Sequence, residues 1–373
     1  MTMLLKNRAL LLLIFFGITG LWGCNLSELT PPSSVIRARI AGIRATPAEI
    51  SLGESTQLDA LFVQPAGDDS EWGALWFSCV EAGGATGCLG GGDFLGDLGG
   101  QPPGDDDDSA EEPRDPRDFQ FSADASFVYT AHGTVIEEAW ELLSPAERVE
   151  GLVVLVSVNY VPVSQEALQE LFLRVTFGPQ NGTPEDAEAA AEELGELIEN
   201  GINAARRIVV SDKSADTPAA IDCPVSELLP NSNPNIEGML LHLDEEGKDQ
   251  GLPMGPVTFV NPEDILVLRP VFREGAIEDY LYITTQGDTE CRQESPYFGW
   301  LSNMGSMAAD YSFFAEEGDL DEIAGKLKIN RLVMPPADQL APSGDLWLVA
   351  RDRRGGIDWM HFNLERGLAL EGR

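Results

Sequence analysis

Residues that commonly carry out catalysis are few in this chain, and their spacings are not those of catalytic motifs. The three histidines, His132, His242 and His361, are far apart, and neither a His-Glu-x-x-His motif nor a Cys-x-x-Cys pair predicts a zinc site. His361 lies in an alternating pattern, where a histidine on a sheet surface is the expected role. Ser306 follows a glycine but lacks the second glycine of a nucleophile turn, so we interpret it as a turn residue.

The carboxylates are numerous but show no catalytic spacing. With 62 Asp and Glu residues, pairs arise by chance. Such a pair hydrolyses glycosides when one acid has a raised pKa and protonates the leaving group, but nothing singles out one pair. Gly325-Lys326 is followed by Leu327, where a phosphate-binding loop needs Ser or Thr. We therefore predict no catalytic residue, no metal site and no cofactor, and keep an acid/base hydrolase as a third hypothesis.

The first 23 residues have the pattern of an export signal. Lys6 and Arg8 precede an apolar run over residues 9–22 that is interrupted only by Gly and Thr. A transmembrane helix needs roughly 20 apolar residues, whereas the core of a secretory signal needs only about 7 to 15. We predict a signal peptide over residues 1–23. An ordinary signal cleaved nearby and an uncleaved signal anchor remain as alternatives.

The end of this segment, Leu21-Trp22-Gly23-Cys24, resembles the lipobox of bacterial lipoproteins, in which a cysteine is acylated and becomes the N-terminus. Trp22 departs from the family pattern, which has a smaller side chain there. The resemblance implies a lipid on Cys24, followed by a tether over residues 24–34. Each buried methylene contributes about 0.8 kcal/mol, so several acyl chains would anchor the protein stably. Because Asn25 rather than Asp follows the cysteine, we expect the outer membrane.

Once this resemblance assigns Cys24 to lipid, Cys79, Cys88, Cys223 and Cys291 remain, an even number in a compartment where disulfides persist. Four cysteines allow three pairings. We prefer Cys79 with Cys88 and Cys223 with Cys291, because each pair then lies within one predicted module.

Alternation of apolar residues predicts strands in a first module over residues 35–178. Ile36, Ala38 and Ile40 share one face, and the aromatic-rich segment 75–79 offers Trp76 to a core between sheets. The stretch Ala45-Thr46-Pro47-Ala48-Glu49-Ile50-Ser51-Leu52-Gly53-Glu54-Ser55 through Leu58, followed by Trp76-Phe77-Ser78-Cys79, is similar to the opening strands of bacterial immunoglobulin-like domains. That similarity implies a β-sandwich of the kind found in surface proteins and lipoproteins, and says little about function.

Residues 81–118 interrupt this module with a composition that cannot bury a core. Ten glycines lie in 81–104 and eight acids in 105–118. Glycine-aspartate pairs occur here, but the fixed nine-residue period of calcium-binding repeats is missing. We predict a long disordered loop.

Two segments carry helix signals. Ser144 and Glu147 have the spacing of a capping box. Thr183-Pro184 followed by two acids starts a second helix, and Asn200-Gly201 would stop it because Gly accepts the left-handed conformation. We predict this helix as a linker over residues 179–204, which either packs across the junction of the modules or acts as a spacer.

A second module is predicted over residues 205–373. Its strands include 206–211, 265–272, 279–284, 297–301 and a final hairpin over 346–362. Trp300 is expected to be its core aromatic, corresponding to Trp76. The polar turn 231–235 could present amides to a sugar or peptide, but Asx turns stiffened by proline are our preferred interpretation. Exposed aromatics such as Trp72 or Tyr297 could contact a sugar or protein, or belong to the core.

The net charge of −38 opposes binding to nucleic acid and to anionic lipid head groups. The sequence thus predicts a mainly β chain of two immunoglobulin-like β-sandwich modules with a connecting α-helix and a long Gly/Asp-rich loop. Its predicted function is a membrane-anchored, extracytoplasmic spacer or protein-binding scaffold without catalysis. The alternative is a cell-envelope adhesin or carbohydrate-binding protein. Predicted partners are a membrane, through the lipid, and an envelope protein or glycan.

Overall fold

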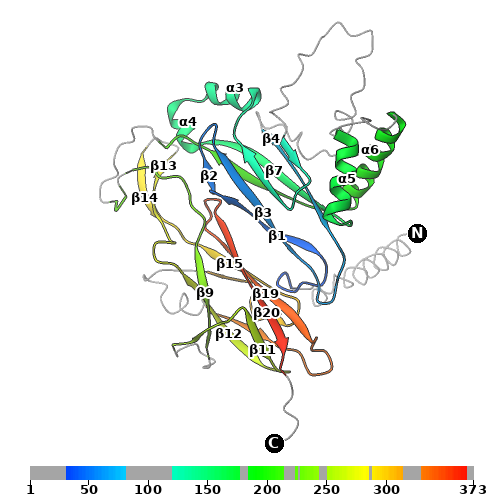
Figure 1. Cartoon of the computed structure of the whole chain (residues 1–373). Coiled ribbons are helices and arrows are strands. Elements are labelled where there is room, and N and C mark those ends of the chain that lie inside the picture. Colours follow the sequence, from blue (N-terminus) through cyan, green and yellow to red (C-terminus); the bar gives the residue numbers. More distant parts are fainter. Residues whose placement is uncertain are drawn as a thin grey trace, which may run out of the picture.

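The computed structural model describes residues 31–80, 120–176, 184–213, 223–225, 227–242, 250–284, 288–313 and 329–367. Cys24, the signal segment 1–23 and the Gly/Asp-rich segment 81–118 lie outside these ranges, so what we predicted for them stays a prediction. The described chain is mainly β and forms two modules stacked one on the other (Figure 1).

The first module is a sandwich of two sheets. One sheet has the strand order β1-β3-β6 and the other β2-β8-β7-β4-β5. Leu58, Trp76, Phe127 and Val156 pack between them in a common core. The strands are β1 (Arg39–Thr46), β2 (Glu49–Ile50), β3 (Ser55–Val63), β4 (Gly73–Val80), β5 (Gln120–Ser122), β6 (Ser126–Thr130), β7 (Leu152–Val161) and β8 (Ile202–Val210).

The second module is also a sandwich of two sheets, here of five strands each, with the strand orders β10-β9-β12-β18-β16 and β11-β20-β19-β15-β17. Its core includes Leu268, Phe298, Trp300 and Leu348. A separate hairpin, β13–β14, is inserted between β12 and β15. The strands are β9 (Ile236–His242), β10 (Leu252–Pro253), β11 (Val257–Val260), β12 (Ile265–Phe272), β13 (Asp279–Ile283), β14 (Thr289–Gln293), β15 (Tyr297–Ser302), β16 (Ser306–Met307), β17 (Tyr311–Phe313), β18 (Asn330–Val333), β19 (Ser343–Arg351) and β20 (Ile357–Arg366).

The strand order of both modules is that of an immunoglobulin-like sandwich, as predicted. In each module a short early strand pairs in parallel with the last strand, β2 with β8 and β11 with β20, while the other ladders are antiparallel. Trp76 on β4 and Trp300 on β15 occupy equivalent places and are 0% and 1% exposed. Each indole N–H is satisfied, by the carbonyl of Asp124 at 3.1 Å and by Ser312 Oγ at 2.8 Å. The predicted correspondence of the two tryptophans is confirmed.

The predicted module boundary at residue 205 is wrong. β8 pairs antiparallel with β7 from Leu152 opposite Val210 to Tyr160 opposite Ile202. Ile208 and Val210 are buried in the first core. Apolar alternation predicted a strand here correctly, but the period of a strand does not say which neighbour it pairs with. The segment between β7 and β8 is therefore an insertion in the first module rather than a linker between modules.

That insertion is a pair of helices, α5 (Gln165–Thr176) and α6 (Pro184–Glu199), of which only α6 was predicted. The pair covers the outer face of the β7 sheet (Figure 1). Leu168 and Leu194 pack there against Leu75 and Val161. α6 begins at the predicted Pro184. Within the described residues, no helix combines the length and apolar character needed to cross a bilayer.

Gly201 follows α6 for a reason that differs from our prediction. The backbone of Gly201 does not adopt the left-handed conformation. A Cβ at this position would instead lie 1.9 Å from Asn159 Oδ1 on β7. Asn159 in turn donates its Nδ2 hydrogen to the carbonyl of Ile198 at 3.1 Å, and the same carbonyl accepts from the Gly201 N–H at 3.1 Å, so both hold the end of the helix against β7. Close approach to β7 is what requires glycine.

Two short helices, α3 (Thr134–Leu142) and α4 (Pro145–Glu150), connect β6 to β7. The predicted capping box is present. The Glu147 N–H donates to Ser144 Oγ at 3.3 Å, and the Ser144 N–H donates to the Glu147 carboxylate at 2.8 Å. These bonds lower the pKa of Glu147 below its usual value.

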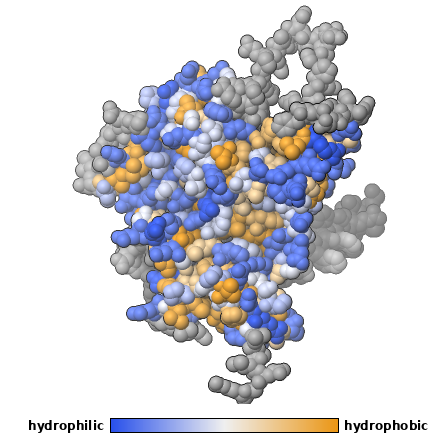
Figure 2. All heavy atoms as spheres, in the orientation of Figure 1, coloured by the Kyte–Doolittle hydropathy of each residue, from blue (hydrophilic) through white to orange (hydrophobic). Residues whose placement is uncertain are grey.

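The two modules pack sheet against sheet. The outer face of β1 and β3 contributes Leu61 and Val63, and the outer face of β19 and β20 contributes Trp347, Val349 and Ile357. All five side chains are at most 8% exposed. Each buried aliphatic side chain of this kind contributes roughly 1.5–3 kcal/mol. The contact therefore joins the modules into one body. On the face seen in Figure 2, hydrophobic and hydrophilic residues are interspersed.

Candidate binding cleft at the module junction

The polar turn 231–235 lies in the junction and ties the modules together. Asn231 is 5% exposed. Its backbone N–H donates to Glu49 Oε2 at 2.6 Å, and its Nδ2 donates to Asp352 Oδ2 at 3.0 Å. Asn233 Nδ2 donates to the carbonyl of Ala45 at 2.6 Å, while its Oδ1 accepts from the Ile357 N–H at 2.9 Å. These amides are therefore used in holding β1 to the second module.

Asp352 organises the loop between β19 and β20. Its Oδ1 accepts from the backbone N–H groups of Arg354, Gly355 and Gly356 at 2.8, 2.9 and 2.8 Å. Gly355 has φ +114, and a Cβ on Gly356 would lie 1.9 Å from Asp352 Oδ2, so this loop needs both glycines. Arg206 of β8 donates to the carbonyls of Ile43 and Gly355, which connects both modules through one side chain. Burial lowers the pKa of Arg206 to about 10, against an opposing effect of Asp352.

A cluster of charged residues continues from this loop to the inserted hairpin. Arg354 Nη1 donates to Glu294 Oε1 at 2.9 Å and to Glu278 Oε2 at 3.1 Å, and the guanidinium lies 4.3 Å from the Tyr280 ring centre. Burial raises the pKa of Glu294 to about 7, and repulsion from Asp352 and Glu278 adds to this effect. The backbone N–H of Glu278 and the positive charge of Arg354 act in the opposite direction.

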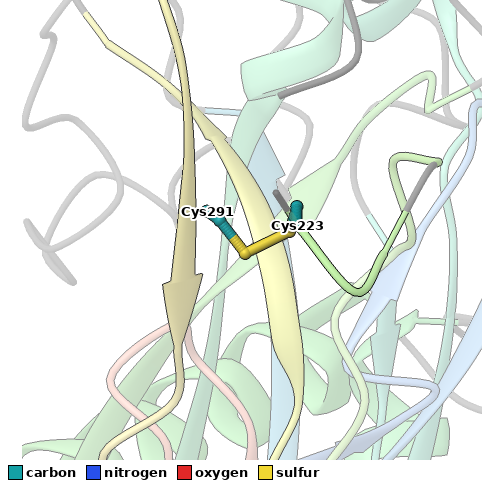
Figure 3. Close-up of a disulfide and its surroundings, with 2 residues drawn as sticks. All are labelled: Cys223 and Cys291. Carbon is teal, nitrogen blue, oxygen red and sulfur yellow. A yellow bond between two sulfur atoms is a disulfide. The ribbon is translucent and has the colours of Figure 1, made fainter. Parts of the chain in front are cut away.

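The predicted Cys223–Cys291 disulfide is present and joins the segment after β8 to strand β14 (Figure 3). It packs beside Val149 of α4, Leu228 and Leu281. A loop of 68 residues closed by a disulfide corresponds to roughly 4 kcal/mol in the chain-entropy treatment. Of the other predicted pair, the backbone of Cys79 is in β4, but Cys88 lies outside the described residues, so this pair stays a prediction.

Beside the apolar contact, a cleft of about 170 Å³ opens to solvent between β1, β15 and β19. Its chemically distinctive lining residues come from both modules and from four separate chain segments, and they are Arg39, Gly299, Asp310, Tyr311 and Arg351. The cleft therefore exists only when the modules are docked.

Two guanidinium groups face this cleft. Arg351 Nη2 donates to the carbonyl of Ala41 at 2.7 Å. A Cβ on Gly299 would lie 3.3 Å from Arg351 Nη1, so the glycine leaves room for the guanidinium to lie across β15. Arg39 Nη2 donates to the carbonyl of Pro32. Its Nε is shielded from solvent and has no hydrogen-bond partner among the described residues.

The charge of the cleft differs from that of the chain. Two arginines face one carboxylate, Asp310, whose Oδ1 accepts from the Ser33 N–H at 2.9 Å. Burial lowers the pKa of Arg39, and Arg37 lowers it further, while Tyr311 and Asp310 oppose the shift. In the described part of the chain, no carboxylate forms an ion pair with Arg39 or Arg351. This is a local excess of positive charge in a protein of net charge −38.

Aromatic rings continue the cleft along the edge of the sheet. Tyr311 and Phe313 on β17 are 50% and 39% exposed. The ring of Tyr297 on β15 lies 6.4 Å from both. Trp72, the other aromatic considered from sequence, packs 5.4 Å from Phe62 within the first module. Of the two aromatic residues considered from sequence, Tyr297 is therefore the one that lies beside the cleft, next to the lining residue Tyr311.

Two of the residues considered for catalysis from sequence, His361 and Ser306, have structural surroundings in the described part of the chain. His361 Nε2 lies 2.6 Å from Asp345 Oδ1, and its ring stacks on Trp347. Hydrogen bonds from His361 and Asn303 lower the pKa of Asp345 against the effect of burial. Ser306 is an exposed residue of β16. No group of three or more His, Cys, Asp or Glu side chains within the described ranges is placed to hold a metal ion.

Comparisons with known proteins return similar structures but no family. No family model and no curated protein matches the chain. Similar solved structures include the two tandem V-type regions of VCBP3, a v-region-containing chitin binding protein, with 9% identity, a TM-score of 0.25 and coverage of 87% of this chain and 98% of that one. The D00-D0 domain of intimin has 6% identity, a TM-score of 0.17 and coverage of 88% and 96%.

A third similar structure is the three N-terminal domains of the highly immunogenic outer capsid protein of bacteriophage RB49. It has 7% identity and a TM-score of 0.17, and the match covers 88% of this chain but 59% of that one. The assignment to the immunoglobulin-like fold rests on the strand order and the two core tryptophans, which are features of this chain itself.

Proposed function

We propose that this chain is a lipid-anchored, extracytoplasmic binding scaffold without catalytic activity, in which two immunoglobulin-like modules form one rigid body. The observation that carries this proposal is the junction. An apolar sheet-to-sheet contact and a buried network around Asn231 and Asp352 fix one module on the other. Flexible linkage is the default between domains whose interfaces are small, so an interface of this kind favours a role that needs fixed geometry.

Rigid presentation suits a binding protein because ordered loops and clefts lose less entropy when a ligand binds. The cleft at Arg39 and Arg351 is completed only by docking of the modules, which gives the rigidity a use. The anchoring part of the proposal rests on the apolar leader and the lipobox resemblance at Cys24, and the outer membrane is the expected location.

Replacement of Cys24 by Ala tests the anchor. The wild-type protein is expected to partition into the detergent phase and to sediment with membranes, because its acyl chains bury many methylenes. The Cys24→Ala protein should appear in the soluble fraction. Unchanged detergent partitioning of the variant, or a mature protein whose residue 24 carries no lipid by mass spectrometry, would contradict the proposal.

A second candidate function, a carbohydrate-binding protein or adhesin, is favoured by the exposed rings of Tyr311 and Phe313 and the half-buried ring of Tyr297, which form a row beside the cleft. Aromatic rings with one apolar face and a polar edge are common at wet binding surfaces. A glycan array separates this candidate from a scaffold that binds protein, since only the former should retain the chain on immobilised glycans.

A further inference from the structure

We propose that the cleft between the modules binds an acidic saccharide, with the carboxylate of a uronic-acid residue held by Arg39 and Arg351. This inference deepens the binding role proposed above and rests on it. The first argument is charge. Two guanidinium groups and one carboxylate line the cleft of a chain with net charge −38, and this local excess favours an anion.

The second argument is the state of the two arginines. Each uses one nitrogen to bond a backbone carbonyl, of Pro32 or Ala41, which fixes the side chain in place. Neither forms an ion pair in the described part of the chain. The planar guanidinium matches a carboxylate in a bidentate geometry, and a pre-positioned group loses little entropy on binding.

The third argument distinguishes a saccharide from a simple anion. Asp310 would repel a bare carboxylate or phosphate, but a carboxylate has acceptor capacity for the hydroxyls of a sugar beyond its bond from the Ser33 N–H. The half-exposed ring of Tyr311 offers a flat apolar face to the ring C–H groups of a sugar. An arrangement of guanidinium, carboxylate and aromatic ring matches the acid, the hydroxyls and the apolar face of one uronic acid.

The fourth argument is size. A cleft of about 170 Å³ lies below the roughly 300–1,000 Å³ of pockets that enclose drug-sized ligands. It suits one sugar ring, with neighbouring rings continuing outward over Phe313 and Tyr297, which lie along the edge of the same sheet.

Titration of the full-length protein in detergent with trigalacturonate, followed by calorimetry, tests the proposal. Its fully methyl-esterified form is the matched ligand, because esterification removes the charge and keeps the rings. We expect binding of the acid, at least about tenfold weaker binding of the ester, and weakening by salt. Arg39→Gln and Arg351→Gln should each weaken binding about tenfold or more, and Tyr311→Ala should weaken it less.

Two control variants lie outside the cleft. Arg174→Gln removes an exposed cation on α5, and Tyr282→Ala removes a 37% exposed ring on β13. Both should bind trigalacturonate as the wild type does. Circular dichroism spectra and melting temperatures would establish that each variant is folded.

The possible results separate this inference from the scaffold proposal. Equal binding of acid and ester would overturn carboxylate recognition, and binding of tetraglutamate in place of trigalacturonate, with the same dependence on Arg351, would overturn the saccharide. Absence of binding to all three probes would overturn the ligand assignment. None of these results bears on the proposed lipid anchor, which the Cys24→Ala variant tests separately.

Discussion

The sheets that carry the two core tryptophans, β2-β8-β7-β4-β5 and β11-β20-β19-β15-β17, correspond strand for strand, but their outer faces are covered in different ways. In the first module, the outer face of the sheet that contains β4 and β7 is covered by α5 and α6 through Leu168 and Leu194. In the second, the equivalent face of β15, β19 and β20 is covered by the first module, through Leu61 and Val63. A sheet with two apolar faces needs a partner on each side. The helices thus cover the outer face of the first module's sheet. The second module has no helices between β19 and β20, so its equivalent sheet face is open to docking of the first module.

Their other insertions differ as well. The hairpin β13–β14 lies between β12 and β15 of the second module and reaches α4 of the first, where the Cys223–Cys291 disulfide packs (Figure 1). The sheets opposite those with the tryptophans also differ, with three strands in the first module and five in the second. The asymmetry of the pair therefore arises from the segments that are added between strands, whereas the cleft is lined by strands β1, β15 and β19 of the docked modules.

The largest expected effect tests whether the two sandwich cores are equivalent. Trp76→Ala and Trp300→Ala each remove a ring that is at most 1% exposed, and each should lower the free energy of unfolding by about 3–5 kcal/mol. Urea denaturation followed by circular dichroism measures this. Because the modules share a junction, we expect a single transition in both variants.

Trp72→Phe provides the control, since its ring is only partly buried and should cost much less. Two separate transitions in Trp300→Ala would mean that the junction does not couple the modules. A loss confined to one of the two tryptophan variants would show that the cores, despite their common topology, carry unequal shares of the stability.

Local patterns in the sequence predicted the sandwich well. Alternation located most strands, the capping box at Ser144 was found as predicted, and Trp76 and Trp300 were paired correctly because both lie in aromatic strands. These features depend on neighbours within a few residues. Periods of two and 3.6 residues report local geometry directly.

The junction and the cleft could not be predicted in the same way. Asn231 and Glu49 are 182 positions apart, and Arg206 lies 163 positions from Ile43, whose carbonyl it contacts. Arg39 and Arg351 look like ordinary polar positions of two strands until docking places them on one cleft. The net charge of −38 could not predict the cleft either, because it does not report that two arginines lie together on one surface.

A smaller effect tests whether one sheet is covered by the helices α5 and α6 and the other by the first module. A Cβ on Gly42 would lie 2.6 Å from Ile357 Cδ1 across the module junction, and a Cβ on Gly73 would lie 2.9 Å from Leu168 Cδ2 of α5. Gly42→Ala and Gly73→Ala should each lower the free energy of unfolding by about 1–3 kcal/mol through overpacking. Ile357→Val shortens the opposing side chain and should restore part of the loss in Gly42→Ala but none in Gly73→Ala.

Chemical denaturation of the three single variants and of the two double variants that contain Ile357→Val gives the coupling energies. Gly275→Ala is the control. A Cβ at Gly275 would have nothing within 4 Å, but φ is +79, so the loss of stability comes from backbone strain alone. Ile357→Val should not restore any of that loss. Equal rescue of Gly42→Ala and Gly73→Ala by Ile357→Val would contradict the assignment of separate covers.

The smallest expected effect is the pH dependence of the free energy of unfolding that Glu294 contributes. It distinguishes the charged cluster beside the junction from the apolar contact, which has no titratable group of this kind. The pKa of Glu294 is raised from 4.5 to about 7 by burial, so between these values the folded state holds the proton more tightly than the unfolded state. Its contribution to stability is fully present below about pH 4.5 and is lost as the pH rises through about 7. After allowance for solvent screening, we expect wild-type stability to fall by about 1–2 kcal/mol more than that of Glu294→Gln between pH 5 and 8.

Glu237→Gln, at an exposed position, should follow the wild type. Parallel pH profiles of the wild type and Glu294→Gln would show that the buried carboxylate keeps its ordinary pKa and that the polar part of the junction is as insensitive to pH as the apolar part.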